Sequence, residues 1–162
     1  MLAVLAFLIY ELVSVRRALK KDVSSIRNLI RESVEQEEIV KRTRADIIAQ
    51  LNDYYVFQID GNIVGCVALH VQNGGEKAEI ACLSVSGAHE NMGIGQKLMT
   101  FAEEAAKQKG VKTLYLLSTR AFNYFQQKGN YKEGSPDDLP AARREKYDLS
   151  GRNSKVLVKA VN

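Results

Sequence analysis

Residues 79–110 read EIACLSVSGAHENMGIGQKLMTFAEEAAKQKG and contain three recognisable parts. Residues 79–86 are rich in apolar side chains and predict a strand, and Gly93 and Gly95 predict a turn after it. A helix ending at Gly110 follows, because apolar residues recur on one face: Ile94, Leu98, Phe101, Ala102 and Ala105. Unpaired amide groups at such a helix N-terminus bind anions, so this stretch predicts a phosphate-binding turn.

The glycine pair alone is a weak signal, because two glycines in a loop often only make a turn. No Gly-Lys-Ser/Thr follows Gly95, as a Walker loop requires, and no third glycine is spaced as in a Rossmann fingerprint. The elements on either side therefore decide how the turn is interpreted.

The preceding segments predict strands and helices that lead into a hairpin. Residues 11–17 alternate as in a strand, Asp22 is suited to cap a helix, and Thr43 with Asp46 resembles a capping box. Asp60-Gly61 joins two apolar runs and is a strong hairpin signal, because it supplies the positive φ of a tight turn.

The following segments complete a β-α-α-β-β-β-α-β-α-β order, typical of a mixed α/β sheet. Residues 111–117 and 155–161 predict strands, and residues 120–128 predict a short helix. Residues 133–146 are polar and predict a loop.

The composition is typical of one soluble globular domain. The chain has 162 residues, 46% of them hydrophobic, and a formal net charge of +4. Because the basic residues are spread along the chain, the charge favours an anionic small ligand over nucleic acid. Cys66 and Cys82 are too few for a disulfide framework or a four-cysteine zinc site, which favours a reduced, cytoplasmic compartment.

The segment MLAVLAFLIY at residues 1–10 is almost wholly apolar. It is shorter than the ~20 residues of a membrane span and lacks the flanks of a signal peptide. We interpret it as a leader of uncertain origin before a single domain over residues 11–162, with no membrane association; the alternative is an added element that packs on the domain or a partner.

The glycine turn in this order of elements resembles the GNAT family of N-acetyltransferases over about residues 12–161. The resemblance implies an α/β fold with a mixed, partly antiparallel sheet flanked by helices, a central strand splayed at the cofactor site, and acetyl-CoA as cosubstrate. It implies that Leu83, Ser84 and Val85 hold the pantetheine arm. The pyrophosphate would be held by Met92, Gly93, Ile94, Gly95 and Gln96. Glu90 departs from the family pattern, because Gln or Arg usually fills that position.

Several further segments resemble the acetyltransferase domain of bacterial N-acetylglutamate synthases: residues 39–44, 79–82, 116–120, 139–140 and 152–157. This resemblance implies acetyl transfer to the α-amine of L-glutamate, the first step of arginine biosynthesis. Arg42, with Lys41 beside it, and Arg152 with Ser154 would hold the two carboxylates. Cys82 and Leu83 would line the acceptor site, and Glu79 would be the base.

The chemistry suits these residue types. Two carboxylates need at least two cations, and planar guanidinium groups suit them best. The ammonium of the acceptor must lose a proton before it attacks the thioester, and Glu79 is a candidate for accepting it. The amide near Leu83 is a candidate for polarising the thioester carbonyl. Tyr124 and Ser118 are candidates for protonating the thiolate, although Phe125 fills the position where the family often has Tyr.

Each assignment has a structural alternative. Arg42 and Arg152 could be solvated, Glu79 could be a solvated strand end, and Cys82 could be a small core residue. No metal site is predicted, because the histidines and carboxylates do not cluster.

The functional alternatives are a GNAT acetyltransferase for another amine, such as an amino acid, peptide or polyamine, and a non-catalytic acetyl-CoA-binding regulatory module. The synthases commonly carry a second, kinase-like domain that 162 residues cannot hold. A homo-oligomer and a domain excised from a longer fused chain are both compatible with the sequence.

Overall fold

A computed structural model describes residues 13–35, 39–72 and 74–161. The predicted leader at residues 1–10, the start of the first predicted strand and Asn73 lie outside the described residues. Within the described ranges, no helix has the length and apolar character needed to cross a bilayer.

The described strands form one mixed sheet in the order β1-β2-β3-β4-β5-β7-β6. In chain order they are β1 (Val13–Arg17), β2 (Tyr54–Ile59), β3 (Asn62–Val71), β4 (Lys77–Val85), β5 (Thr113–Ser118), β6 (Lys132–Glu133) and β7 (Lys155–Ala160). Strands β4 and β5 pair in parallel, and the other neighbouring pairs of this sheet are antiparallel. Asp60 at φ 49° and Gly61 at φ 80° turn β2 into β3, which confirms the predicted hairpin.

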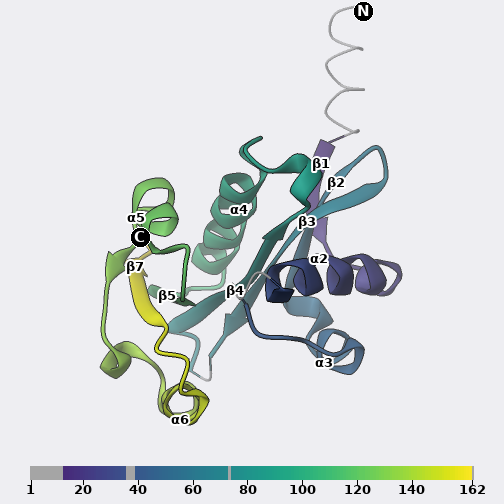
Figure 1. The fold of residues 1–162 in the computed structure, drawn as a ribbon. Helices are drawn as coiled ribbons and strands as arrows, with labels where there is room; N and C mark the ends of the chain where they lie inside the picture. The colour runs from purple at the N-terminus through teal and green to yellow at the C-terminus, as the bar shows by residue number, and fades with distance from the viewer. Residues whose placement is uncertain (1–12, 36–38, 73, 162) are drawn as a thin grey trace, which may run out of the picture.

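Helices cover both faces of the sheet (Figure 1). They are α2 (Val23–Glu35), α3 (Arg44–Ala49), α4 (Ile94–Gln108), α5 (Phe122–Gly129) and α6 (Ala141–Ser150). The apolar stripe of α4 packs with Tyr55, Val67 and Leu69 on one face, and α5 lies beside it. On the other face, α2 packs with Tyr54 and Val56. The predicted layers of helix and sheet are confirmed, because α2 and α4 each bury a stripe with helical spacing against the sheet.

The predicted face of α4 needs one correction. Phe101 was expected on the buried stripe, but its side chain remains 39% exposed and packs edge-on against Tyr55, with ring centroids 5.2 Å apart. Met99 and Ala106 are fully buried instead. The buried stripe of α4 is therefore rotated slightly about the helix axis, relative to the stripe that the sequence predicts.

Strands β4 and β5 separate after Glu79. Their ladder contains Lys77 with Thr113, Ala78 with Leu114 and Glu79 with Tyr115. Beyond these pairs, β4 continues against β3 and β5 continues against β7. The sheet therefore opens into a V with Glu79 at its apex, which confirms the predicted splay of a central strand.

A β-bulge in β4 lies beside this opening. Ala68 pairs with Ala81 and Cys66 pairs with Ser84, so Cys82 and Leu83 together face a single residue of β3. Cys82 has a φ of 53°, in the left-handed region that residues other than glycine seldom adopt. The bulge turns the Cys82 side chain toward the α2 side of the sheet and Leu83 toward the α4 side.

The polar segment at residues 133–146 is not the loop that the sequence predicts. It contains the end of β6, the short 3-10 helix η4 (Pro136–Asp138) and the first turns of α6. Pro140 precedes α6, and Gly151 at φ 62° ends it. No residue of α6 is fully buried, so the helix carries little of the apolar periodicity by which the others were predicted.

Candidate active site

A cavity of about 620 Å³ occupies the opening between β4 and β5. It is bounded by the end of β4, the start of α4, the end of β5 and α5. Nine of the predicted site residues line it: Cys82, Leu83, Val85, Gly93, Ile94, Gly95, Gln96, Ser118 and Tyr124. His89 and Lys128 also line the cavity and were not predicted as site residues.

The glycine turn presents the N-terminus of α4 to this cavity. Gly93 is the N-cap residue, with φ 76°, and no side chain caps the helix. The first amide groups of α4 are therefore available to an anion. A Cβ on Gly93 would meet nothing within 4 Å, so glycine is favoured here by backbone conformation rather than by lack of space.

Gly95 is constrained by a different contact. A Cβ at this position would lie 2.8 Å from the Tyr124 hydroxyl oxygen, which is too close for an unstrained contact. Tyr124 therefore extends from α5 across the first turn of α4. The absence of a side chain at Gly95 makes room for the Tyr124 hydroxyl at the cavity wall.

Tyr124 and Ser118 bring two hydroxyl groups to the cavity. Burial raises the pKa of Tyr124, so its hydroxyl stays protonated at neutral pH and can donate a hydrogen bond. Ser118 is 5% exposed, and its Oγ accepts a hydrogen bond from the Ala121 amide at 3.0 Å. The Ser118 hydroxyl proton is not used in that bond, so both residues can donate a proton or a hydrogen bond.

Glu79 lies at the apex of the opening and is 8% exposed. Its carboxylate accepts hydrogen bonds from Arg143 of α6, from Nε at 2.9 Å and from Nη2 at 3.3 Å. Arg143 lies in the segment predicted as a loop and was not predicted as a site residue. The Pro140 and Gly151 helix boundaries are the local signals that could have revealed its helix.

Arg42 lies in the segment before α3 and has no carboxylate partner among the described residues. Its Nη1 donates to the carbonyl oxygens of Val40 at 3.0 Å and Lys41 at 3.4 Å. Burial raises the pKa of the Cys82 thiol, and the Arg42 charge acts in the opposite direction, which places Arg42 near Cys82. Arg42 therefore brings a positive charge to the side of the bulge where Cys82 lies.

Arg152 is the second predicted cation without a carboxylate partner among the described residues, and it is half-buried. It lies between Gly151 at φ 62° and Asn153 at φ 54°, in a tight turn that leads into β7. Ser154 is 6% exposed, and its carbonyl oxygen accepts a hydrogen bond from the Tyr147 hydroxyl at 2.8 Å. This bond ties the turn to α6.

The other predicted residues lie outside the lining of the cavity: Glu79, Ser84, Met92, Lys41, Arg42, Arg152 and Ser154. Ser84 points toward α2, where it accepts a hydrogen bond from Ser33 at 3.0 Å. Met92 is 58% exposed, and Lys41 is also exposed. In the part of the chain that the structure describes, no three His, Cys, Asp or Glu side chains gather as metal ligands would.

The chain belongs to the acetyltransferase (GNAT) family, which matches residues 20–129. Its similarity extends to amino-acid acetyltransferases of Neisseria meningitidis, at 34% identity over 150 residues, covering 93% of this chain and 34% of the relative. The corresponding enzyme of Pseudomonas syringae is 35% identical over 147 residues, covering 91% of this chain and 34% of the relative. This chain thus spans about a third of the length of these relatives.

A solved structure shares both fold and sequence with the chain. N-acetylglutamate synthase from Neisseria gonorrhoeae, complexed with coenzyme A and N-acetyl-glutamate, superposes with a TM-score of 0.89 at 34% identity. The match covers 93% of this chain and 35% of the synthase chain.

Proposed function

We propose that this chain transfers the acetyl group of acetyl-CoA to the α-amine of L-glutamate. The observation that carries the proposal is the splay of β4 and β5. It opens a cavity at a glycine turn and places a buried carboxylate, Glu79, at its apex. The similarity to N-acetylglutamate synthase supports glutamate as the acceptor. Such an activity would serve arginine biosynthesis in the cytoplasm.

The residues around the opening fit acetyl-CoA. Beyond Glu79, β4 lacks a strand partner on its β5 side, so the backbone of Leu83, Ser84 and Val85 can hydrogen-bond an extended pantetheine arm. The amides from residue 93 to residue 96, at the uncapped start of α4, would hold the pyrophosphate, with Met92 beside them. The bound cosubstrate supplies an acetyl group activated as a thioester.

Glu79 would accept the proton that the glutamate ammonium must lose. A carboxylate is a suitable base when it lies within reach of the amine, directly or through one water. The amine nitrogen then bonds to the acetyl carbon, and the carbon–sulfur bond breaks. The amide of Leu83 would polarise the acetyl carbonyl. Tyr124 or Ser118 would give a proton to the sulfur and regain one from the second proton that the nitrogen loses as the amide forms.

The cations would select the acceptor. Arg42, with Lys41 next to it, would bind one carboxylate of glutamate near Cys82. Arg152 and Ser154 would bind the other. Both guanidinium groups lack a carboxylate partner among the described residues. The two carboxylates of a dicarboxylic ligand would supply the negative charges to pair with them.

The test is release of coenzyme A from acetyl-CoA, measured with a thiol reagent in the presence of single amines. We expect turnover that depends on glutamate, with little on glutamine, lysine, peptides or polyamines. Turnover only with one of the other amines would show that this amine, and not glutamate, is the acceptor. Binding of acetyl-CoA without turnover on any amine would contradict an enzymatic role and favour a regulatory module.

A further inference from the structure

The ion pair between Glu79 and Arg143 connects the apex of the strand opening to α6. Two nitrogens of one guanidinium group contact both carboxylate oxygens, at 2.9 Å and 3.3 Å. Such a bidentate pair fixes the plane of the carboxylate as well as its position. The Glu79 side chain is 11% exposed and that of Arg143 is 24% exposed, so solvent screens the pair only partly.

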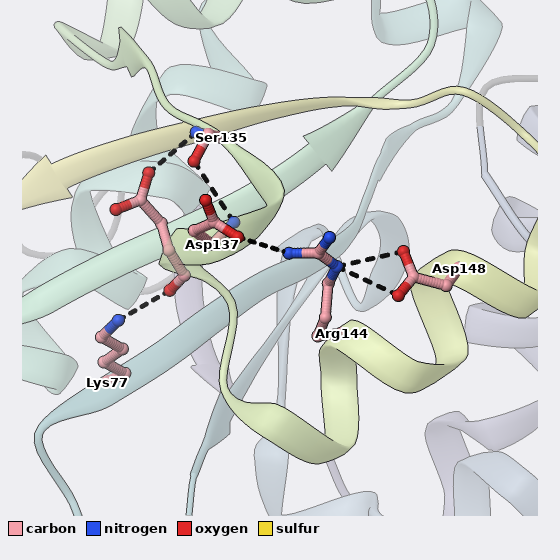
Figure 2. A network of polar contacts seen from close by, with 6 residues as sticks. Lys77, Ser135, Asp137, Arg144 and Asp148 are labelled. Atoms are coloured by element: carbon pink, nitrogen blue, oxygen red, sulfur yellow. Dashed lines mark hydrogen bonds and ion pairs between the residues drawn. The ribbon is translucent and has the colours of Figure 1, made fainter.

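Polar contacts tie α6 to η4 and η4 to β4 (Figure 2). Arg144 donates to Asp137 at 2.8 Å and to Asp148 at 3.0 Å, which ties the first turn of α6 to η4. Lys77 of β4 donates to the carbonyl oxygen of Asp138 at 2.7 Å, which ties η4 to the sheet. Successive helical residues point about 100° apart, so the orientation of Arg144 toward η4 leaves Arg143 facing β4.

Four other titratable groups share the surroundings of Glu79: His70, Tyr115, Cys82 and Lys77. His70 lies opposite Glu79 on β3, but its Nδ1 is 2.8 Å from an Asp53 carboxylate oxygen. Tyr115 is fully buried, and its hydroxyl lies near Glu79. Among the described residues, this hydroxyl has no hydrogen-bond partner at ordinary distance and angle.

Arg143 is the cation that pairs with Glu79, because the neighbouring groups are neutral or directed to other partners. Burial raises the pKa of Tyr115 and of the Cys82 thiol, so both stay neutral at ordinary pH. Lys77 is directed to a backbone carbonyl of η4. Among the described residues, the Glu79 carboxylate therefore forms its ion pair with Arg143.

We propose that Arg143 is a positioning residue, which holds the Glu79 carboxylate oriented to accept the proton of the incoming ammonium. This inference rests on the proposed function. A carboxylate has about four acceptor positions, and the Arg143 fork uses two of them, so the carboxylate can still take a proton. Arg143 itself does not touch the reacting atoms.

The test compares Arg143→Ala, Arg143→Lys and Lys146→Ala by measuring kcat and KM for glutamate and for acetyl-CoA. Lys146 is exposed on the same helix, so Lys146→Ala removes an equal charge without touching the pair. In Arg143→Ala the Glu79 carboxylate loses the fork that orients it, so kcat should fall about tenfold or more while both KM values stay near those of the parent.

Arg143→Lys keeps the charge but loses the fork, so it should recover only part of the lost kcat. Lys146→Ala should match the parent in kcat and in both KM values. An Arg143→Ala variant with the parent's kcat would overturn the positioning role. A rise in both KM values together with the loss of kcat would also overturn it, because that result indicates a structural role.

Thermal unfolding of each variant accompanies the kinetics. Because no residue of α6 is fully buried, truncation of Arg143 should leave the fold intact. If it does not, kcat and the two KM values of Arg143→Lys alone decide the inference. A parent protein with no glutamate turnover would instead overturn the proposed function itself.

Discussion

Truncation of Arg42 or Arg152 should weaken the use of glutamate and leave the use of acetyl-CoA nearly unchanged. Neither guanidinium group has a carboxylate partner among the described residues, so each is free to bind a substrate carboxylate. Neither side chain lines the cavity assigned to acetyl-CoA. The loss should therefore appear in kcat/KM for glutamate and not in KM for acetyl-CoA.

The size of the loss follows from the charge and burial of the two side chains. A hydrogen bond to a charged group is worth about 1.5–3 kcal/mol. Both arginines are only half-buried, so solvent screening favours the lower part of that range, about 1.5–2 kcal/mol. At about 1.4 kcal/mol per tenfold, each truncation should lower kcat/KM for glutamate about 10–30-fold.

The assay is steady-state kinetics of Arg42→Ala and Arg152→Ala with glutamate, glutamine and aspartate. Arg44→Ala is the matched control, because Arg44 is exposed and its Nη1 donates to Ser24 Oγ at 3.2 Å. Glutamine should lose less than glutamate when the arginine facing the side-chain carboxylate is removed. The reasoning is refuted if both variants keep the parent's glutamate kinetics, or if Arg44→Ala loses as much as they do.

Three further perturbations test other parts of the structure. Gly95→Ala places a methyl group 2.8 Å from the Tyr124 hydroxyl, so the Tyr124 side chain must move and acetyl-CoA binding should weaken in calorimetric titration; unchanged binding would contradict the packing. Glu79→Gln should lower kcat about 100-fold or more, whereas a variant with the parent's kcat would show that the amine loses its proton by another route. The hydrogen bond from Arg16, together with the Leu19 amide, holds the pKa of the buried Asp22 carboxyl below its usual value. The ionised carboxylate therefore stabilises the folded state above about pH 4, the usual pKa of an unfolded Asp, and this contribution is lost as pH falls through the pKa of Asp22 in the folded protein. Asp22→Asn should therefore lower the free energy of unfolding by about 1–3 kcal/mol at neutral pH and flatten its acid dependence in urea titrations; an equally steep acid dependence would show that other carboxyl groups cause it.

Local sequence signals predicted the elements that build the opening. The Asp60-Gly61 turn needs only two residues that accept positive φ, and the start of α4 needs only Gly93 in the same conformation. The hairpin, the glycine turn and the amphipathic helix after it are therefore readable from the sequence, because each depends on neighbours along the chain.

The missed features depend on contacts between distant residues. The pair of Glu79 and Arg143 joins positions 64 residues apart, and α6 has no fully buried residue to give it apolar periodicity. The left-handed conformation of Cys82 is imposed by the strand register around the bulge, not by the residue type. The sequence therefore predicted the acid–base candidate but neither its charged partner nor the bulge beside it.

The most direct test of the central claim is a competition in one reaction. The protein is incubated with acetyl-CoA and an equimolar mixture of the common amino acids, and the acetylated products are identified by mass spectrometry. Competing substrates are consumed in proportion to their kcat/KM values, so the product ratio reports specificity without separate assays. Our account predicts that N-acetylglutamate predominates and that the Arg42→Ala variant loses this preference. A mixture dominated by another acetylated amino acid, or one with no acetylated product, would contradict it.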